Sequence, residues 1–144
     1  MEEKKGESQS RSITLLNDVR GVPSLANFID EVCEEASLDM ATAMQVNLAI
    51  EEAVVNVMDY AYPSGTEGEV VVETKIENGK LQFVITDHGV AFDPTAKAEV
   101  DTTLPAEERS IGGLGIHLIR KIMDDVKYER VNDMNILTLN KKIQ

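Results

Sequence analysis

A chain of 144 residues has room for one domain with a buried core, and we expect it to carry no additional sensor or membrane-spanning module. Its 26 acidic and 14 basic residues give a formal net charge of -12, which argues against nonspecific binding to DNA, RNA or anionic membranes. The single cysteine, Cys33, cannot form an internal disulfide, and the sequence has no signal-like or membrane-spanning apolar run. We therefore expect a cytoplasmic protein that contacts neither nucleic acid nor membrane.

The N-terminal segment 1–12 is charged, polar and without periodicity, so it predicts a disordered tail before one domain over residues 13–144. The run SITLLN over 12–17 predicts a strand. A helix is expected over 22–37, and Ser24 is a candidate for its N-terminal cap.

The segment 46–63 predicts a second helix, because its apolar residues recur at helical spacing. Glu52 and Asn56 fall together on a strip beside the apolar face, while Glu51 points away from them. A carboxylate can accept a proton from a hydroxyl, and an amide oxygen is a suitable ligand for Mg²⁺. The strip is either a site for this chemistry or only the solvated shoulder of an amphipathic helix.

The runs EVVVETKI and LQFVITD predict two antiparallel strands, because the turn between them contains Asn78 and Gly79. The second strand alternates apolar and polar residues and ends at Asp87, followed by His88 and Gly89. An acceptor-only carboxylate beside a residue without a side chain could receive the amino group of a purine. Asp followed by Gly is also an ordinary turn, and that alternative stays open.

The segment 92–111 is polar, contains two prolines and predicts a lid over a nucleotide site. Gly112, Gly113 and Gly115 come immediately before a run with helical periodicity. Glycines and the free amides of a helix N-terminus suit phosphate oxygens, although the run matches neither a P-loop nor a GxGxxG motif. A tight connection without a ligand is the alternative.

Two final strands are expected over 127–131 and 136–142, joined by an Asn-Asp turn. Hairpins rather than regular crossovers predict an α/β (α+β) fold. We expect a two-layer sandwich with helices on one face of a largely antiparallel mixed sheet.

The order and spacing of the three candidate pieces resemble those of the GHKL (histidine kinase-like) ATPase superfamily, and within it the single-domain anti-sigma factor serine/threonine kinases. The Glu52–Asn56 run resembles the N box, Asp87–Gly89 the adenine-binding box and Gly112–Gly115 the phosphate-binding box. The resemblance extends from about Ile13 to the C-terminus and implies the Bergerat-type ATP-binding fold, with ATP and Mg²⁺ as cofactors.

The resemblance implies roles for individual residues. Glu52 would be the general base and Asn56 would hold Mg²⁺. Asp87 would read the adenine, and Gly89 would allow the ring to approach the backbone.

Five further residues receive binding roles from the resemblance. Gly113, Leu114 and Gly115 would contact the phosphates. Arg109 would reach the terminal phosphate from the lid, and Thr138 would help hold the adenine through water.

Three features depart from the family pattern. Tyr60 stands four residues after the N-box Asn, where many relatives carry a basic residue. Ala91 replaces the second glycine of the adenine box, and the turn 132–135 lacks a glycine that the family often has.

The resemblance predicts a protein serine/threonine kinase that phosphorylates an anti-anti-sigma (STAS-type) protein and sequesters a sigma factor. It also implies a homodimer paired through the N-terminal strand region. The alternative is a non-catalytic switch whose partner affinity depends on the bound nucleotide. The ATPase half of a sensor kinase is disfavoured, because no helical segment with a phosphoacceptor His precedes the domain.

Overall fold

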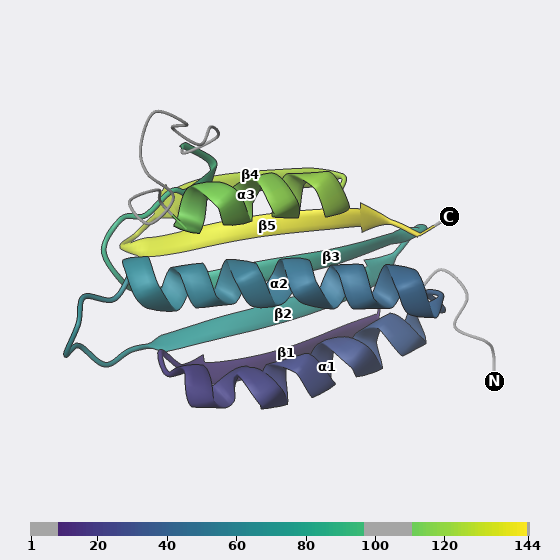
Figure 1. Cartoon of the computed structure of the whole chain (residues 1–144), viewed down its shortest axis with the longest axis horizontal. Coiled ribbons are helices and arrows are strands. Elements are labelled where there is room, and N and C mark those ends of the chain that lie inside the picture. Colours follow the sequence, from purple (N-terminus) through teal and green to yellow (C-terminus); the bar gives the residue numbers. More distant parts are fainter. Residues whose placement is uncertain (1–8, 97–110, 144) are drawn as a thin grey trace.

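The computed structural model describes residues 9–96 and 111–143, with only the helical backbone for 111–115. The elements, in chain order, are β1 (Gln9–Leu16), η1 (Val19–Gly21), α1 (Val22–Glu35), α2 (Met40–Tyr60), β2 (Glu69–Glu77), β3 (Lys80–Asp87), η2 (Pro94–Ala96), α3 (Ile111–Ile122), β4 (Asp125–Val131) and β5 (Met134–Lys142). The three α-helices lie side by side over one face of a single sheet (Figure 1). None of the helices in the described part of the chain is long and apolar enough to cross a membrane.

The sheet has the strand order β1-β2-β3-β5-β4. All four neighbouring pairs are antiparallel, so the described sheet is antiparallel throughout rather than mixed. The two-layer sandwich expected from the hairpins is confirmed, with α2 over the middle of the sheet between α1 and α3 (Figure 1).

The helix-facing side of the sheet is built by the alternation of each strand. In β3, Leu81, Phe83 and Ile85 are buried beneath the helices, and Asp87 continues the same alternate row. The strand period thus places a carboxylate on the core side at the end of the strand.

The β1 strand begins at Gln9, which pairs with Ile76 of β2. Residues 9–12 are therefore part of the sheet, and the predicted boundary of the tail at residue 12 is wrong. Polar residues can pair at a sheet edge because the ladder uses backbone groups, which composition does not reveal.

The helix starts differ in how they are capped. The α1 helix begins after Gly21 without a side-chain cap and has Pro23 in its first turn, so the assignment of Ser24 as cap is wrong. In α2 the Asp39 carboxylate accepts a hydrogen bond of 2.8 Å from the Thr42 amide.

Both predicted hairpin turns are present. Asn78 and Gly79 have φ values of 53° and 73°, and Asn132 and Asp133 have 50° and 67°. Two central residues with positive φ suit a two-residue hairpin, and Asn and Asp tolerate this region better than most residues. The β4–β5 turn therefore forms without the glycine that the family often has.

Candidate nucleotide site

Three segments meet at one end of the molecule. Figure 1 shows the C-terminal end of α2, the end of β3 and the start of α3 at the same end, on the left of the view. These segments carry the three motifs singled out in the sequence, so the fold brings the three motifs to the same end of the molecule.

Asp87 is buried, with 1% of its surface exposed. Its Oδ1 accepts hydrogen bonds from the Gly89 amide at 2.8 Å and from Asn135 Nδ2 at 2.9 Å. Its Oδ2 is also buried and finds no hydrogen-bond partner among the described residues. An unpaired buried carboxylate oxygen is costly, and its presence indicates a place where a ligand donor fits.

Burial raises the pKa of the Asp87 carboxyl above its ordinary value, while the bonds from Asn135 and Gly89 act in the opposite direction. The two donors therefore favour the ionised form, which accepts hydrogen bonds with both oxygens.

Gly89 lies directly against the end of α2. A Cβ atom at this position would lie 2.1 Å from the Ala61 carbonyl oxygen, which also accepts a 2.7 Å hydrogen bond from the Val90 amide. The close approach to the helix therefore requires glycine, in addition to the expected approach of a purine ring.

Asn56 and Glu52 lie on α2, toward the same end. Asn56 is 2% exposed, and its Nδ2 has no hydrogen-bond partner in the described part of the chain. Asn56 is thus not a solvated shoulder residue. It precedes Ala61 by five residues, about 7.5 Å along the helix axis.

Glu52 is partly buried one turn before Asn56. Burial raises the pKa of its carboxyl, and the negative charge of Asp59 raises it further. Glu51 instead faces Asp30 of α1, whose charge adds to the burial that raises the pKa of Glu51. The two adjacent glutamates therefore face different surroundings, as the helical spacing predicts.

These groups fit a nucleotide with a bound Mg²⁺. In residues 9–96 and 111–143, no three His, Cys, Asp or Glu side chains gather as a metal site. A magnesium ion held mainly by phosphates and water needs few protein ligands, and the oxygen of the Asn56 carboxamide is of the right type. The unpaired atom of Asn56 is its Nδ2, a donor that suits a phosphate oxygen rather than the metal.

The glycine motif lies within α3 rather than before it. The helix begins at Ile111, so Gly112 and Gly113 fall in its first turn, where backbone amides lack partners inside the helix. Leu114 and Gly115 continue the same helix. Arg109 lies outside the described residues.

Thr138 lies on the wrong side of the sheet for its expected role. It alternates with the buried Leu137 and Leu139 and pairs with Val84, so it faces away from the helices. The residue opposite Asp87 across the β3–β5 ladder is Asn135. The expectation that Thr138 lies beside the adenine acid is therefore corrected in favour of Asn135.

Asn135 is not among the site residues predicted from the sequence, where it is named only as part of a turn. The alternation of the strand could have predicted that Asn135 is buried, because Asn135 continues the alternate row of Leu137 and Leu139.

Tyr62 was also missed. Its hydroxyl donates to the Glu69 carbonyl at 2.7 Å and accepts from the His88 amide at 3.0 Å, so it holds the turn after Asp87 from the other side. Nearby, the rings of Tyr60 and Phe92 stack with centroids 5.3 Å apart.

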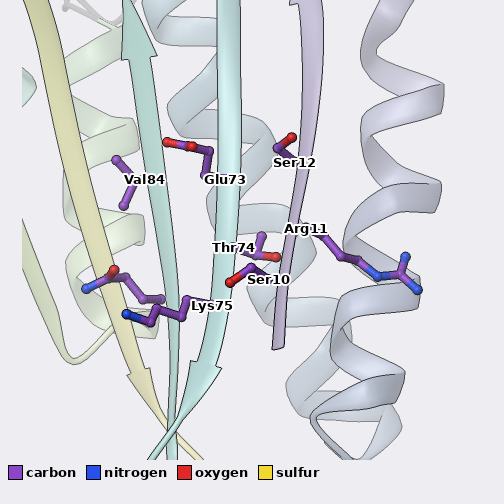
Figure 2. A pocket seen from close by; sticks show the side chains of 8 residues that line it. Ser10, Arg11, Ser12, Glu73, Thr74, Lys75 and Val84 are labelled. Atoms are coloured by element: carbon purple, nitrogen blue, oxygen red, sulfur yellow. The ribbon is translucent and has the colours of Figure 1, made fainter. Parts of the chain in front are cut away.

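The open face of the sheet carries a separate hollow of about 440 Å³, lined by Ser10, Arg11, Ser12, Glu73, Thr74, Lys75, Gln82 and Val84. Figure 2 shows this hollow over β1, β2 and β3, with the helices behind the sheet. None of the predicted site residues lines it, so it is separate from the candidate site.

The sequence is similar to one family of protein domains and to individual proteins within it. The profile of the histidine kinase-like ATPase domain matches residues 15–141. The serine-protein kinase RsbW of Listeria monocytogenes is 36% identical over 111 residues, covering 74% of this chain and 64% of that protein. An anti-sigma F factor of Priestia megaterium is 29% identical over 109 residues, covering 74% of this chain and 70% of that protein.

The fold also has a counterpart of known structure. The RsbU and RsbW domains of a Mycobacterium tuberculosis protein superpose with a TM-score of 0.67 at 15% identity, over 94% of this chain and 32% of the other. The match to the Listeria kinase spans a little under two thirds of that relative's length. Because the family profile matches nearly the whole chain, this protein belongs to the family of histidine kinase-like ATPase domains.

Proposed function

We propose that this chain is an ATP-dependent protein serine/threonine kinase of the anti-sigma type. It transfers the terminal phosphate of ATP to a Ser or Thr of an anti-anti-sigma (STAS-type) protein, and in its other state it sequesters a sigma factor. We place both activities in the cytoplasm, in keeping with the buried free thiol of Cys33.

One observation carries the proposal. Three buried polar side-chain atoms have no partner among the described residues, and two of them, Asp87 Oδ2 and Asn56 Nδ2, belong to segments that lie at the same end of the molecule as the start of α3. A protein keeps unpaired buried polar groups at a cost, which a bound ligand can remove. The names of the relatives, a serine-protein kinase and an anti-sigma factor, support the same reading.

Each group has a task in this proposal. Asp87 accepts the adenine amino group, Asn56 holds the metal through its amide oxygen, and the first-turn amides of α3 receive phosphate oxygens. The metal, when bound, offsets phosphate charge. Glu52 accepts the proton of the attacking hydroxyl, and its raised pKa improves its strength as a base. Positioning and charge stabilisation supply most of the rate in phosphoryl transfer, so this small set is sufficient.

Arg109 and Thr138 have different places in the proposal. We keep Arg109 as the lid residue that reaches the terminal phosphate. Thr138 is replaced by Asn135 beside Asp87, because Asn135 shares its side of the sheet.

The homodimer belongs to the same proposal. β1 forms an edge of the described sheet, and Leu16 at its end is 55% exposed. A sheet edge with exposed apolar residues is a natural pairing surface. Light scattering coupled to size-exclusion chromatography measures the mass in solution, and a monomer at micromolar concentration would contradict this part.

The experiment compares Glu52→Ala with Glu51→Ala as a matched control on the same helix. The purified proteins are incubated with labelled ATP, Mg²⁺ and candidate STAS-type proteins, and ATP binding is measured separately by calorimetry. Loss of the base should slow transfer by about 10²- to 10⁴-fold while ATP still binds, whereas Glu51→Ala should transfer normally. Equal transfer by Glu52→Ala and the wild type would refute Glu52 as the base.

A nucleotide-dependent switch without transfer is the second candidate. In its favour, the position where many relatives carry a basic residue holds Tyr60, which stacks on Phe92 instead. If the wild type binds ATP and a sigma factor but phosphorylates no antagonist, the switch replaces the kinase.

A further inference from the structure

Asn135 occupies the centre of a hydrogen-bond network at the end of β3. It is 3% exposed, and its side chain makes four hydrogen bonds. Its Nδ2 donates to Asp87 Oδ1 at 2.9 Å and to the Val90 carbonyl at 2.8 Å. Its Oδ1 accepts from the Phe92 amide at 3.2 Å and from the Tyr128 hydroxyl at 2.5 Å. The carboxamide therefore has its full set of partners.

The partners also determine which way the carboxamide points. The Phe92 amide can only donate and the Val90 carbonyl can only accept, so a flipped Asn135 would face both of them with the wrong atom. The amide nitrogen is consequently held against Asp87. No rotation about the last bond of Asn135 leaves the network satisfied.

This arrangement divides the two oxygens of Asp87 between two tasks. The Gly89 amide and Asn135 Nδ2 both bond to Oδ1, while Oδ2 is buried with no partner in the described residues. One oxygen serves as the anchor and the other remains an acceptor for a ligand. Two donors on one oxygen also prevent the carboxylate from rotating freely.

We propose that Asn135 is a positioning residue for nucleotide recognition: it holds the Asp87 carboxylate so that Oδ2 accepts the exocyclic amino group of adenine. This inference rests on the proposed function, in which Asp87 reads the base. Neither the sequence motifs nor the names of the relatives assign a role to Asn135.

The role has a consequence for specificity. A fixed acceptor discriminates between a purine with an amino group at position 6 and one without it, because only the former supplies a donor. A carboxylate that can turn adapts to either purine, so loss of Asn135 should reduce this discrimination as well as affinity.

The test measures dissociation constants of the full chain for two probes, ATP and purine riboside triphosphate, which lacks the 6-amino group. In Asn135→Ala, the affinity for ATP should fall about tenfold to a hundredfold, the range for a lost hydrogen bond to a charged group. The affinity for the analogue, which makes no bond to Asp87 Oδ2, should change about threefold or less. The ratio of the dissociation constant for the analogue to that for ATP, which measures the preference for ATP, should therefore fall strongly.

Two further variants complete the experiment. Tyr128→Phe removes only the hydroxyl that bonds to Asn135 Oδ1, and should lower the ratio about two- to fivefold without creating a cavity. Asn140 lies on the same strand but bonds to Gln82 on the open face. The variant Asn140→Ala should therefore have the same ratio of the two dissociation constants as the wild type. Thermal unfolding identifies folded variants, and Tyr128→Phe decides the matter if Asn135→Ala does not fold.

The outcomes separate this inference from the proposed function. A strong fall in the ratio of the two dissociation constants in Asn135→Ala, or a smaller fall in Tyr128→Phe, supports the positioning role. Equal losses for both nucleotides overturn it, because a merely structural residue would weaken every ligand alike, while ATP binding by the wild type leaves the proposed function standing. A wild type that binds neither nucleotide overturns both.

Discussion

The turn after β3 and the strip on α2 carry the two halves of the proposed site, and they are held in opposite ways. Asp87 and the backbone of the turn after it are hydrogen-bonded from several sides, by Asn135, Tyr62 and the end of α2. On the strip, Asn56 is buried with an unpaired amide nitrogen in the described residues, and Glu52 is partly exposed.

The difference follows from what each half must do. Base recognition requires an acceptor in one orientation, which a folded network can provide before the ligand arrives. Metal and phosphate ligation requires free groups, because the bound species complete the coordination themselves. In the proposed function, the turn is therefore built by the protein, and the strip is completed by the nucleotide.

The largest expected effect comes from breaking the turn with Gly89→Ala. The added methyl group meets the Ala61 carbonyl oxygen, so we expect a loss of about 3 kcal/mol in the free energy of unfolding, measured by urea denaturation. Gly65→Ala is the control, because Gly65 has φ of 87° and no atom within 4 Å of the added methyl group. It should lose only about 1 kcal/mol through its backbone conformation, and equal losses would contradict the contact with α2.

Asp87→Asn should separate binding from stability within the turn. Its amide oxygen can still accept from Gly89 and Asn135, but the amide nitrogen replaces the acceptor Oδ2. We expect ATP affinity to fall about tenfold to a hundredfold in calorimetry, while the free energy of unfolding at neutral pH rises by about 1 kcal/mol.

The gain in stability should depend on pH. Because burial raises the pKa of Asp87 in the folded state, its favourable contribution is present below the unfolded pKa and is lost as pH rises through the folded value. The free energy of unfolding of Asp87→Asn should therefore exceed that of the wild type at neutral pH and equal it in acid. Asp39 has a pKa lowered by its bonds to Thr42, so Asp39→Asn should show the opposite trend with pH. A constant difference between Asp87→Asn and the wild type at all pH values would contradict the burial of a charged Asp87.

Asn56→Leu tests whether the strip is completed by the metal. The change removes a buried amide with an unpaired nitrogen, so stability should be kept, while the gain in ATP affinity on adding Mg²⁺ should fall about tenfold. Asn47→Leu is the control on the same helix, because the Nδ2 of Asn47, unlike that of Asn56, donates to Asp30 and to the Ala26 carbonyl, although its Oδ1 is unpaired in the described residues. It should lose stability and keep the magnesium effect. The reverse pattern would refute Asn56 as the metal ligand.

The smallest effect concerns Glu52. Removing the Asp59 charge in Asp59→Asn should lower the pKa of Glu52, since that charge is the second cause of its elevation after burial. A base works only when ionised, so the acid limb of the pH-rate profile for transfer should move to lower pH, by less than about one unit for such a partly exposed pair. Asp30→Asn, beside Glu51, should leave the limb in place. A shift of the limb to higher pH would contradict this assignment.

Much of the site could be predicted from local spacing. Glu52 and Asn56 share a helical strip, Glu51 faces elsewhere, and Asp87 ends a strand whose alternate residues are buried. The hairpin at Asn78 and Gly79 was equally predictable, because both residues tolerate positive φ. Each of these inferences depends only on neighbours within a few positions.

Other features could not be predicted, because they depend on residues far apart in the chain. The pairing of Asp87 with Asn135 joins positions 48 residues apart, and the contact of Gly89 with Ala61 depends on where α2 ends against the sheet. The start of β1 at Gln9 depends on its partner strand, not on the polarity of residues 9–12.

By itself, the amino-acid sequence determined the order of the elements along the chain and the side of each element on which its polar groups lie. Helix and strand periods are local properties of the chain. Only the tertiary structure decided which of those groups meet. Burial of Asn56 required a neighbouring layer, and selection of Asn135 rather than Thr138 required the register of two strands. Register is a non-local quantity, and a shift of one residue would have placed Met134 or Ile136 opposite Asp87 instead of Asn135.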